Sequence, residues 1–224
     1  MYMRRKNSFI YTMGRGDKTL KRFNRKKNIY SSSLFRILIV IITITLMGGG
    51  LYFLHYSKTS KGKVGKEIDS YKNVPVYYNG LNYTKTYGES YSEDGYYYGY
   101  KWQCVEYIKR FYKEAKNHKM PDVYGNAKDF FDNSVPQGEL NKSRDLIQYR
   151  NEGNVKPEPD DLIVFSGNIF GHVAIVTEVT EDYVEVIQQN VYSKTREKYD
   201  LTEKDGKYIV GKYKKIVGWL RKKQ

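Results

Sequence analysis

Cysteine is nearly absent from this chain, which contains only Cys104 among its 224 residues. A single cysteine excludes an intrachain disulfide and a structural zinc site built from several thiolates. Histidine is also scarce, and His55, His118 and His172 show no metal-ligand spacing among themselves. We therefore expect no metal and no cofactor.

Acidic residues are scarce at the N-terminus. Residues 1–36 contain 11 Lys and Arg but only 1 acidic residue, which gives +10 of the total net charge of +14. The remaining 188 residues contain 28 basic and 24 acidic residues, a net charge of +4. A basic tail is typical of nucleic-acid binding or of a membrane topology signal, and the segment that follows it distinguishes the two.

Charge is absent from residues 37–54, an apolar run of 18 residues that is close to the length needed to span a bilayer core. Arg36 flanks this run on one side, and Tyr52, Phe53 and Tyr56 lie at the other side, where interfacial aromatic residues are common. We predict a basic cytoplasmic tail at 1–36 and a transmembrane signal anchor at 37–56, with the following residues outside the cell membrane. The protein would then have a membrane partner and no nucleic-acid partner. Cleavage near glycines 48–50, followed by secretion, is the alternative.

Lys, Gly and Ser dominate residues 57–80, which lack an apolar period and predict a linker. Residues 81–224 predict one domain. Its first half predicts, in order, a Tyr- and Gly-rich loop at 81–100, a helix from 104 to about 118, a short helix at 126–131, and loop at 132–160 with a helical turn near Leu146. Its second half predicts strands at 161–166, 171–179, 183–189, 207–213 and 216–220, with a turn at 180–182. A helix followed by an antiparallel sheet indicates an α+β fold.

Cys104 lies at the start of the predicted helix, because apolar residues recur at helical spacing from this position onward. In the first turn of a helix, backbone N–H groups and the helix dipole stabilise a thiolate and lower its pKa, which suits a nucleophile. The alternative is a small buried hydrophobe, since free cysteine is among the most buried residue types. Nearby, Tyr96, Tyr97, Tyr98 and Tyr100 either line a substrate groove or pack in the core.

His172 begins a predicted strand, where its ring can meet a helix N-terminus at the edge of a sheet, although most strand histidines are not bases. The return strand carries Gln188 and Asn190 on one face. Hairpin pairs whose residue numbers sum to 360 bring Gln188 beside His172, whereas a sum of 362 brings Asn190 there. Either side chain could orient the imidazole. If Gln188 does so, we expect it to accept the Nδ1–H bond and to leave Nε2 facing Cys104.

Four blocks resemble the CHAP domain family: residues 99–107, which contain Trp-Gln-Cys-Val-Glu, residues 171–176, which read Gly-His-Val-Ala-Ile-Val, residues 188–190 and residues 217–219. The first two blocks are specific when they occur together. The resemblance extends from about residue 80 to 222 and is greatest to the amidase domain of bacterial glutathionylspermidine synthetase/amidase. It implies a papain-like, NlpC/P60-type fold in which a catalytic helix packs on an antiparallel sheet.

The same resemblance implies that Cys104 is the nucleophile and His172 the general base of a cysteine amidase or peptidase. Gln188 lies where that amidase has a glutamate. A glutamine carbonyl can orient an imidazole but lacks the charge that stabilises an imidazolium, so Asn190 stays an alternative for this role. We expect Gln103 and the Cys104 backbone N–H to donate to the oxyanion.

Three functions follow from this resemblance and the predicted location. The first is hydrolysis of amide bonds in peptidoglycan peptides through a thioester, outside a bacterial membrane. The second is cleavage of a glutathionylspermidine-like conjugate, and the third is an inactive module that binds wall peptides. The oligomeric state is unknown.

Overall fold

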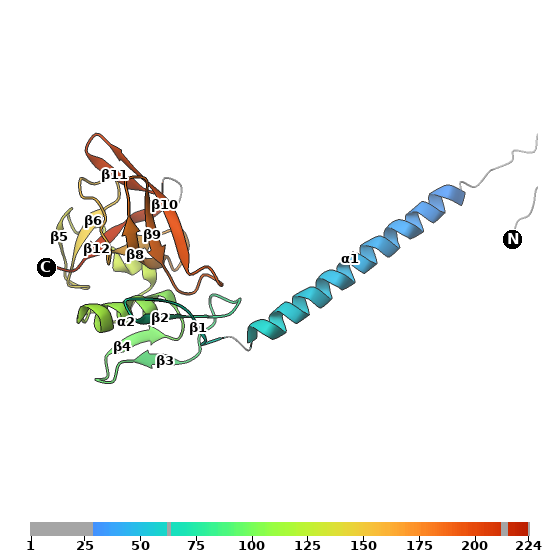
Figure 1. Cartoon of the computed structure of the whole chain (residues 1–224), viewed down its shortest axis with the longest axis horizontal. Coiled ribbons are helices and arrows are strands. Elements are labelled where there is room, and N and C mark those ends of the chain that lie inside the picture. The colour runs from blue at the N-terminus through green and yellow to red at the C-terminus, as the bar shows by residue number, and fades with distance from the viewer. Residues whose placement is uncertain (1–28, 62–63, 212–214, 224) are drawn as a thin grey trace, which may run out of the picture. The chain divides into compact units, whose positions relative to one another are not determined.

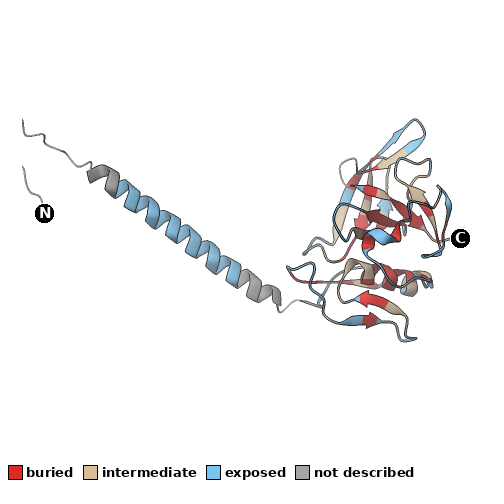
Figure 2. Ribbon diagram, turned by 180° about the vertical axis from the view of Figure 1, so that it is seen from behind, coloured by how far each residue is buried: buried red, intermediate tan, exposed pale blue. Residues whose placement is uncertain are grey.

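The computed structural model describes residues 29–61, 64–211 and 215–223. The chain forms two compact units, residues 1–51 and residues 52–224. Helix α1 (Ile29–Lys61) contains an apolar stretch, Ser33–Leu54, whose side chains are exposed along its length (Figure 2). At 1.5 Å per residue its 22 residues extend about 33 Å, enough to cross a bilayer core. This helix is long and apolar enough to span a membrane or to act as a signal sequence. Most of the basic tail lies outside the described residues.

The second unit is built on one antiparallel sheet with the strand order β11-β10-β9-β8-β7-β12-β6-β5 (Figure 1). Its strands are β5 (Glu139–Asn141), β6 (Leu146–Arg150), β7 (Leu162–Phe165), β8 (His172–Val179), β9 (Tyr183–Ile187), β10 (Arg196–Lys204), β11 (Lys207–Val210) and β12 (Ile216–Arg221). Two further hairpins precede the sheet in the chain. They pair β1 (Glu67–Tyr71) with β2 (Val74–Tyr77) and β3 (Glu89–Tyr91) with β4 (Tyr97–Tyr100).

Helix α2 (Cys104–Lys116) packs on one face of this sheet and carries the candidate nucleophile. Its apolar stripe, which includes Tyr107, Ile108 and Phe111, is buried against side chains of β7 and β8 such as Val164 and Val173. Each such side chain contributes about 1.5–3 kcal/mol through burial. Successive strand residues alternate between faces, so a second core forms on the opposite face of the sheet. The α+β fold with a helix on an antiparallel sheet is confirmed.

The domain begins earlier than predicted. Residues 57–80 are not a linker throughout, because α1 continues to Lys61 and β1 and β2 form a hairpin within this segment. Strand β1 has a polar, largely exposed sequence that carries no apolar alternation. A long-range contact stabilises it, because Asp69 forms an ion pair with Arg196 of β10 at 3.0 Å. A contact between residues so far apart in the chain has no local sequence signal.

Other elements also differ from the prediction. Residues 81–100 contain the β3–β4 hairpin, and the turn expected near Leu146 is strand β6. Polar residues such as Gln148 interrupt the apolar pattern of β6, so the sequence does not indicate a strand there. Gln148 is fully buried and forms hydrogen bonds with Asp132 and Asn141. Strand β10 was not predicted either. The short helix expected at 126–131 is a single 3₁₀ turn, η1 (Ala127–Phe130).

Candidate active site

Cys104 begins α2, preceded by Gln103 in an extended conformation with φ −79° and ψ 159°. The thiol is half-buried and lines a cavity. Burial raises the pKa of the Cys104 thiol to about 11, although the backbone N–H groups of Val173, Val105 and Cys104 act in the opposite direction. The helix N-terminus therefore lowers the pKa as expected, but burial outweighs it. The neutral thiol is the favoured resting form.

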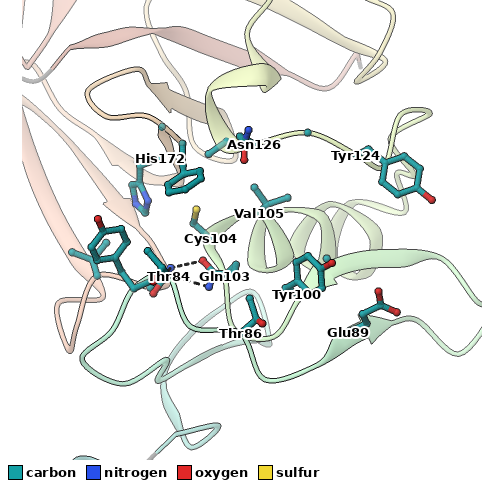
Figure 3. Close-up of a pocket in the computed structure, with 18 of the residues that line it drawn as sticks. Thr84, Thr86, Glu89, Tyr100, Gln103, Cys104, Val105, Tyr124, Asn126 and His172 are labelled. Carbon is teal, nitrogen blue, oxygen red and sulfur yellow. Dashed lines mark hydrogen bonds between the residues drawn. The ribbon is translucent and has the colours of Figure 1, made fainter.

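His172 enters the same cavity from the start of β8, and Figure 3 shows its ring beside the Cys104 thiol. The ring packs against Phe165, with centroids 5.6 Å apart. Burial lowers the pKa of His172, while its hydrogen bond with Gln188 raises it in part. With the thiol pKa raised and the imidazole pKa lowered, the neutral forms of both groups are favoured.

Gly171 determines the backbone conformation that places His172 in the cavity. Its φ of +74° lies in the left-handed region. A Cβ at this position would meet the backbone N of Lys128 at 2.5 Å and the carbonyl O of Phe165 at 2.7 Å. Only glycine fits between these two backbones without a shift of the strand start.

Gln188, just beyond β9, is the residue that contacts the imidazole. Its Oε1 lies 2.9 Å from His172 Nε2, and its Nε2 donates to the carbonyl of Lys194 at 3.3 Å. The second bond fixes which end of the amide faces the ring, so His172 Nε2 carries the proton and donates it. The predicted pairing of ring nitrogens is therefore wrong, because Nδ1 and not Nε2 is left unprotonated for the thiol.

Asn190 does not contact His172, although the observed pairing of β8 with β9, if it continued, would place Asn190 opposite His172. Ile175 pairs with Ile187, which is the register that sums to 362. However, β9 ends at Ile187, and Asn190 turns away with a left-handed φ of 68°. Gln188 then reaches the ring diagonally across the hairpin. Asn190 instead joins two loops through Asn79 at 2.6 Å and Gln103 at 2.6 Å.

The amide of Gln103 is already occupied. Its Nε2 donates to the carbonyls of Tyr83 at 3.2 Å and Lys85 at 2.9 Å, and its Oε1 accepts from Asn190. Both Nε2 protons are engaged, so a role as oxyanion donor would require one of these bonds to break. In this structure Gln103 anchors the loop 83–85 to the helix N-terminus. The backbone N–H groups at the start of α2 stay adjacent to the thiol.

A buried polar network beneath the site was not anticipated from the sequence. Gln189 donates to Glu106 at 2.7 Å and to the carbonyl of Gln103 at 3.0 Å, and it accepts from the backbone of Tyr77 at 2.7 Å. Glu106 forms an ion pair with Arg110 at 2.7 Å. This network joins α2, β2 and the end of β9, so it fixes the nucleophile relative to Gln188. The sequence signal for this network is weak: Glu106 follows Cys104 by two residues and lies four residues before Arg110, a spacing at which the two side chains can pair on a helix.

The cavity has a volume of about 690 Å³ and is rich in tyrosine. Tyr97 and Tyr100 line it, whereas Tyr96 and Tyr98 do not, so the tyrosine run divides between the groove and the core. Four further tyrosines come from other segments: Tyr83, Tyr91, Tyr124 and Tyr192. All four are more than half exposed. Their side chains offer apolar faces and hydroxyl groups to a peptide-like substrate.

The match to known families falls on this site. Residues 95–190 match the model of the CHAP domain family, from the turn before β4 to the end of the Gln188 segment. This part of the chain is a CHAP domain. The match includes Cys104, His172 and Gln188, and it confirms the resemblance drawn from the sequence blocks. CHAP domains are amidases or peptidases, so the domain belongs to a hydrolase class that acts on amide bonds.

The CHAP-containing chain is also similar to a longer protein, the trypanothione synthetase of Crithidia fasciculata. The two are 32% identical over 154 residues, which is 64% of this chain and 24% of that protein. The chain thus spans about a quarter of the length of this curated relative.

Proposed function

We propose that this protein is a membrane-anchored, extracytoplasmic cysteine amidase or peptidase that cleaves amide bonds in peptidoglycan peptides. One observation carries the proposal. Cys104 and His172 share a cavity, and Gln188 Oε1 lies 2.9 Å from His172 Nε2, which leaves Nδ1 as the second ring nitrogen. A nucleophile, a base and a group that orients the base are the parts that acyl transfer requires.

The chemistry follows from the neutral resting pair. His172 Nδ1 accepts the thiol proton as Sγ attacks the substrate carbonyl, and the tetrahedral oxyanion forms beside the N–H groups at the start of α2. The imidazolium then donates this proton to the leaving amine, which departs and leaves a thioester. Water attacks the thioester while His172 takes its proton, and collapse of the second intermediate releases the acid and regenerates the thiol.

The anchor favours a wall substrate. Ser33–Leu54 is long and apolar enough to cross a membrane, and the basic tail before it is the charge pattern of a cytoplasmic N-terminus. The CHAP domain would then lie outside a bacterial membrane, where peptidoglycan is an abundant polymer rich in amides. Cleavage after a signal peptide would release the same domain.

The similarity to trypanothione synthetase favours a second candidate, a small glutathionylspermidine-like conjugate. Such a substrate is usually intracellular, and the anchor argues against it. A third candidate is an inactive wall-peptide module, motivated by the uncharged Gln188 in place of a glutamate. The Cys104–His172 pair argues against that candidate.

The test is hydrolysis by the full-length protein in detergent. Purified peptidoglycan and synthetic glutathionylspermidine are incubated separately with wild type and with Cys104→Ala, and new termini are identified by mass spectrometry. We expect new termini in peptidoglycan with wild type alone. Cleavage of the conjugate only would replace the first candidate with the second. Absence of turnover on both, with binding of wall peptides retained, would favour the inactive module.

A further inference from the structure

The cavity is unusual in its charge. Among the residues that line it, Glu89 of β3 is the only acidic one, and none is lysine or arginine. Glu89 is exposed, and it has no ion-pair partner within the part of the chain that the structure describes. Within the described residues, its carboxylate accepts one hydrogen bond, from the hydroxyl of Tyr91 to Oε2 at 2.6 Å. A carboxylate that faces a cavity without a cation is able to accept one from a ligand.

A series of tyrosine rings in mutual contact begins at the Tyr91 that donates to this carboxylate. The ring of Tyr91 lies 5.2 Å from that of Tyr97, and the ring of Tyr97 lies 6.2 Å from that of Tyr124. Tyr100 is the cross-strand partner of Glu89. The hydrogen bond to Glu89 raises the pKa of Tyr91 to about 12, so its phenol stays neutral and continues to donate. Tyrosine faces attract ammonium groups, in addition to the attraction of the carboxylate.

A lysine packs against this cluster from the buried side. Lys109 of α2 lies 4.9 Å from the Tyr97 ring and donates to the carbonyl of Val123 at 2.9 Å. Lys109 is fully buried and does not line the cavity. It therefore leaves the Glu89 carboxylate unpaired and the cavity side of the cluster open.

The cluster has a defined position relative to the chemistry. In Figure 3, His172 lies on one side of Cys104, whereas Glu89 and Tyr100 lie on the other, with Tyr124 on that same side. The leaving amine takes its proton from His172, so the leaving group occupies the His172 side. The acyl part of the substrate extends toward Glu89.

We propose that Glu89, with Tyr91, Tyr97 and Tyr124, forms a subsite that binds an ammonium group on the acyl side of the scissile amide. The proposal rests on the hydrolase function above and specifies its substrate class. Two sources share this chemistry: the side-chain amine of a diamino acid in a wall peptide, and the free α-amine of a γ-glutamyl conjugate. Glu89 is then a specificity-determining residue that acts through binding.

The test compares substrates that differ only in the acyl-side amine. A synthetic lysine-containing wall stem peptide and its Nε-acetyl form are given to the full-length protein in detergent. Glutathionylspermidine and its form acetylated on the γ-glutamyl α-amine are the second pair. For the pair that is cleaved, we expect Glu89→Gln to raise KM about tenfold with kcat unchanged. The acetylated substrate should show the raised KM already in wild type, and Glu89→Gln should not raise it further.

Glu93→Gln is the matched control. Glu93 is an exposed carboxylate in the turn of the same hairpin, and it does not line the cavity. It should leave KM unchanged for every substrate. The proposal is overturned if Glu89→Gln and Glu93→Gln raise KM equally. It is also overturned if Glu89→Gln raises KM for an acetylated substrate as much as for the free amine.

A binding measurement separates this proposal from the proposed function. The probe is Nα-acetyl-lysine methylamide, titrated into wild type, Cys104→Ala and Glu89→Gln, with Tyr fluorescence or NMR as the readout. Saturable binding to wild type and Cys104→Ala that is at least about fivefold weaker in Glu89→Gln supports the subsite even if no amide is cleaved. Equal binding by all three overturns the subsite while hydrolysis by wild type would still support the proposed function.

Discussion

The hydrogen bond between Gln188 and His172 offers the sharpest test of the proposed mechanism. Gln188 is 2% exposed, and its amide makes two bonds, one to the ring and one to the carbonyl of Lys194. Gln188→Ala would leave both partners unsatisfied, at a cost of about 1–3 kcal/mol for each buried group. It would also free the imidazole to place its proton on Nδ1, which is the nitrogen that must accept the thiol proton. We expect kcat to fall by about 10–10³-fold.

The pH dependence distinguishes an orienting role from a purely structural one. A hydrogen bond from Nε2–H to a carbonyl stabilises the imidazolium, so Gln188 raises the pKa of His172 against the lowering effect of burial. The base must be neutral, hence activity is lost as the pH falls through this pKa. Gln188→Ala should move the acid limb of kcat/KM to lower pH. Gln188→Glu places a carboxylate there and should move this limb to higher pH, with activity retained.

Gln188→Glu also has a structural cost. The Gln188 Nε2 that donates to the Lys194 carbonyl becomes a carboxylate oxygen, which faces that carbonyl without a proton to share. This contact explains why an amide fits here better than an acid. The assay is kcat/KM against pH for the three proteins on one peptide substrate. Asn190→Ala is the control, because Asn190 does not touch the ring, and its acid limb should match wild type. Acid limbs that fail to move in opposite directions for the two Gln188 variants would refute the orienting role.

Three further predictions follow from the site and the anchor. Cys104→Ala should abolish hydrolysis with the fold intact. Because burial raises the pKa of the thiol to about 11, alkylation of the wild type by iodoacetamide should become about tenfold faster per pH unit between pH 7 and 10. An alkylation rate independent of pH would indicate a preformed thiolate. Gly171→Ala should lower kcat, and it should lower the free energy of unfolding by about 1–3 kcal/mol, because its Cβ would meet two backbone segments. The control Gly167→Ala should change neither quantity much, because the nearest atoms to its Cβ lie at 4.0 Å. Protease added to intact protoplasts should remove the CHAP domain. A protected domain together with a cleaved N-terminal tail would show the opposite topology. A mature N-terminus near Leu51 would indicate a cleaved signal peptide.

Local patterns were sufficient for the elements that bear the two reactive groups. The apolar stripe of α2 follows the helical period, and β8 and β9 are rich in β-branched residues around a short turn. The strands that were missed, such as β1 and β10, have polar sequences without a clear apolar alternation. Their hairpin partners are close in the chain, and the ion pair between Asp69 of β1 and Arg196 of β10 is a tertiary contact that a local sequence pattern does not indicate.

The sequence by itself determined the class of fold, the helix that begins at Cys104, the strand that begins at His172 and the family of the domain. Only the tertiary structure decided that Gln188 rather than Asn190 holds the imidazole, and that it does so through Nε2. The reason is geometric. The length of the turn between β8 and β9 sets which residues pair in the hairpin, whereas the point at which β9 ends depends on tertiary contacts with other loops. The same holds for the cavity, where Glu89 of one hairpin, Tyr124 of a distant loop and Cys104 of α2 come together only through packing.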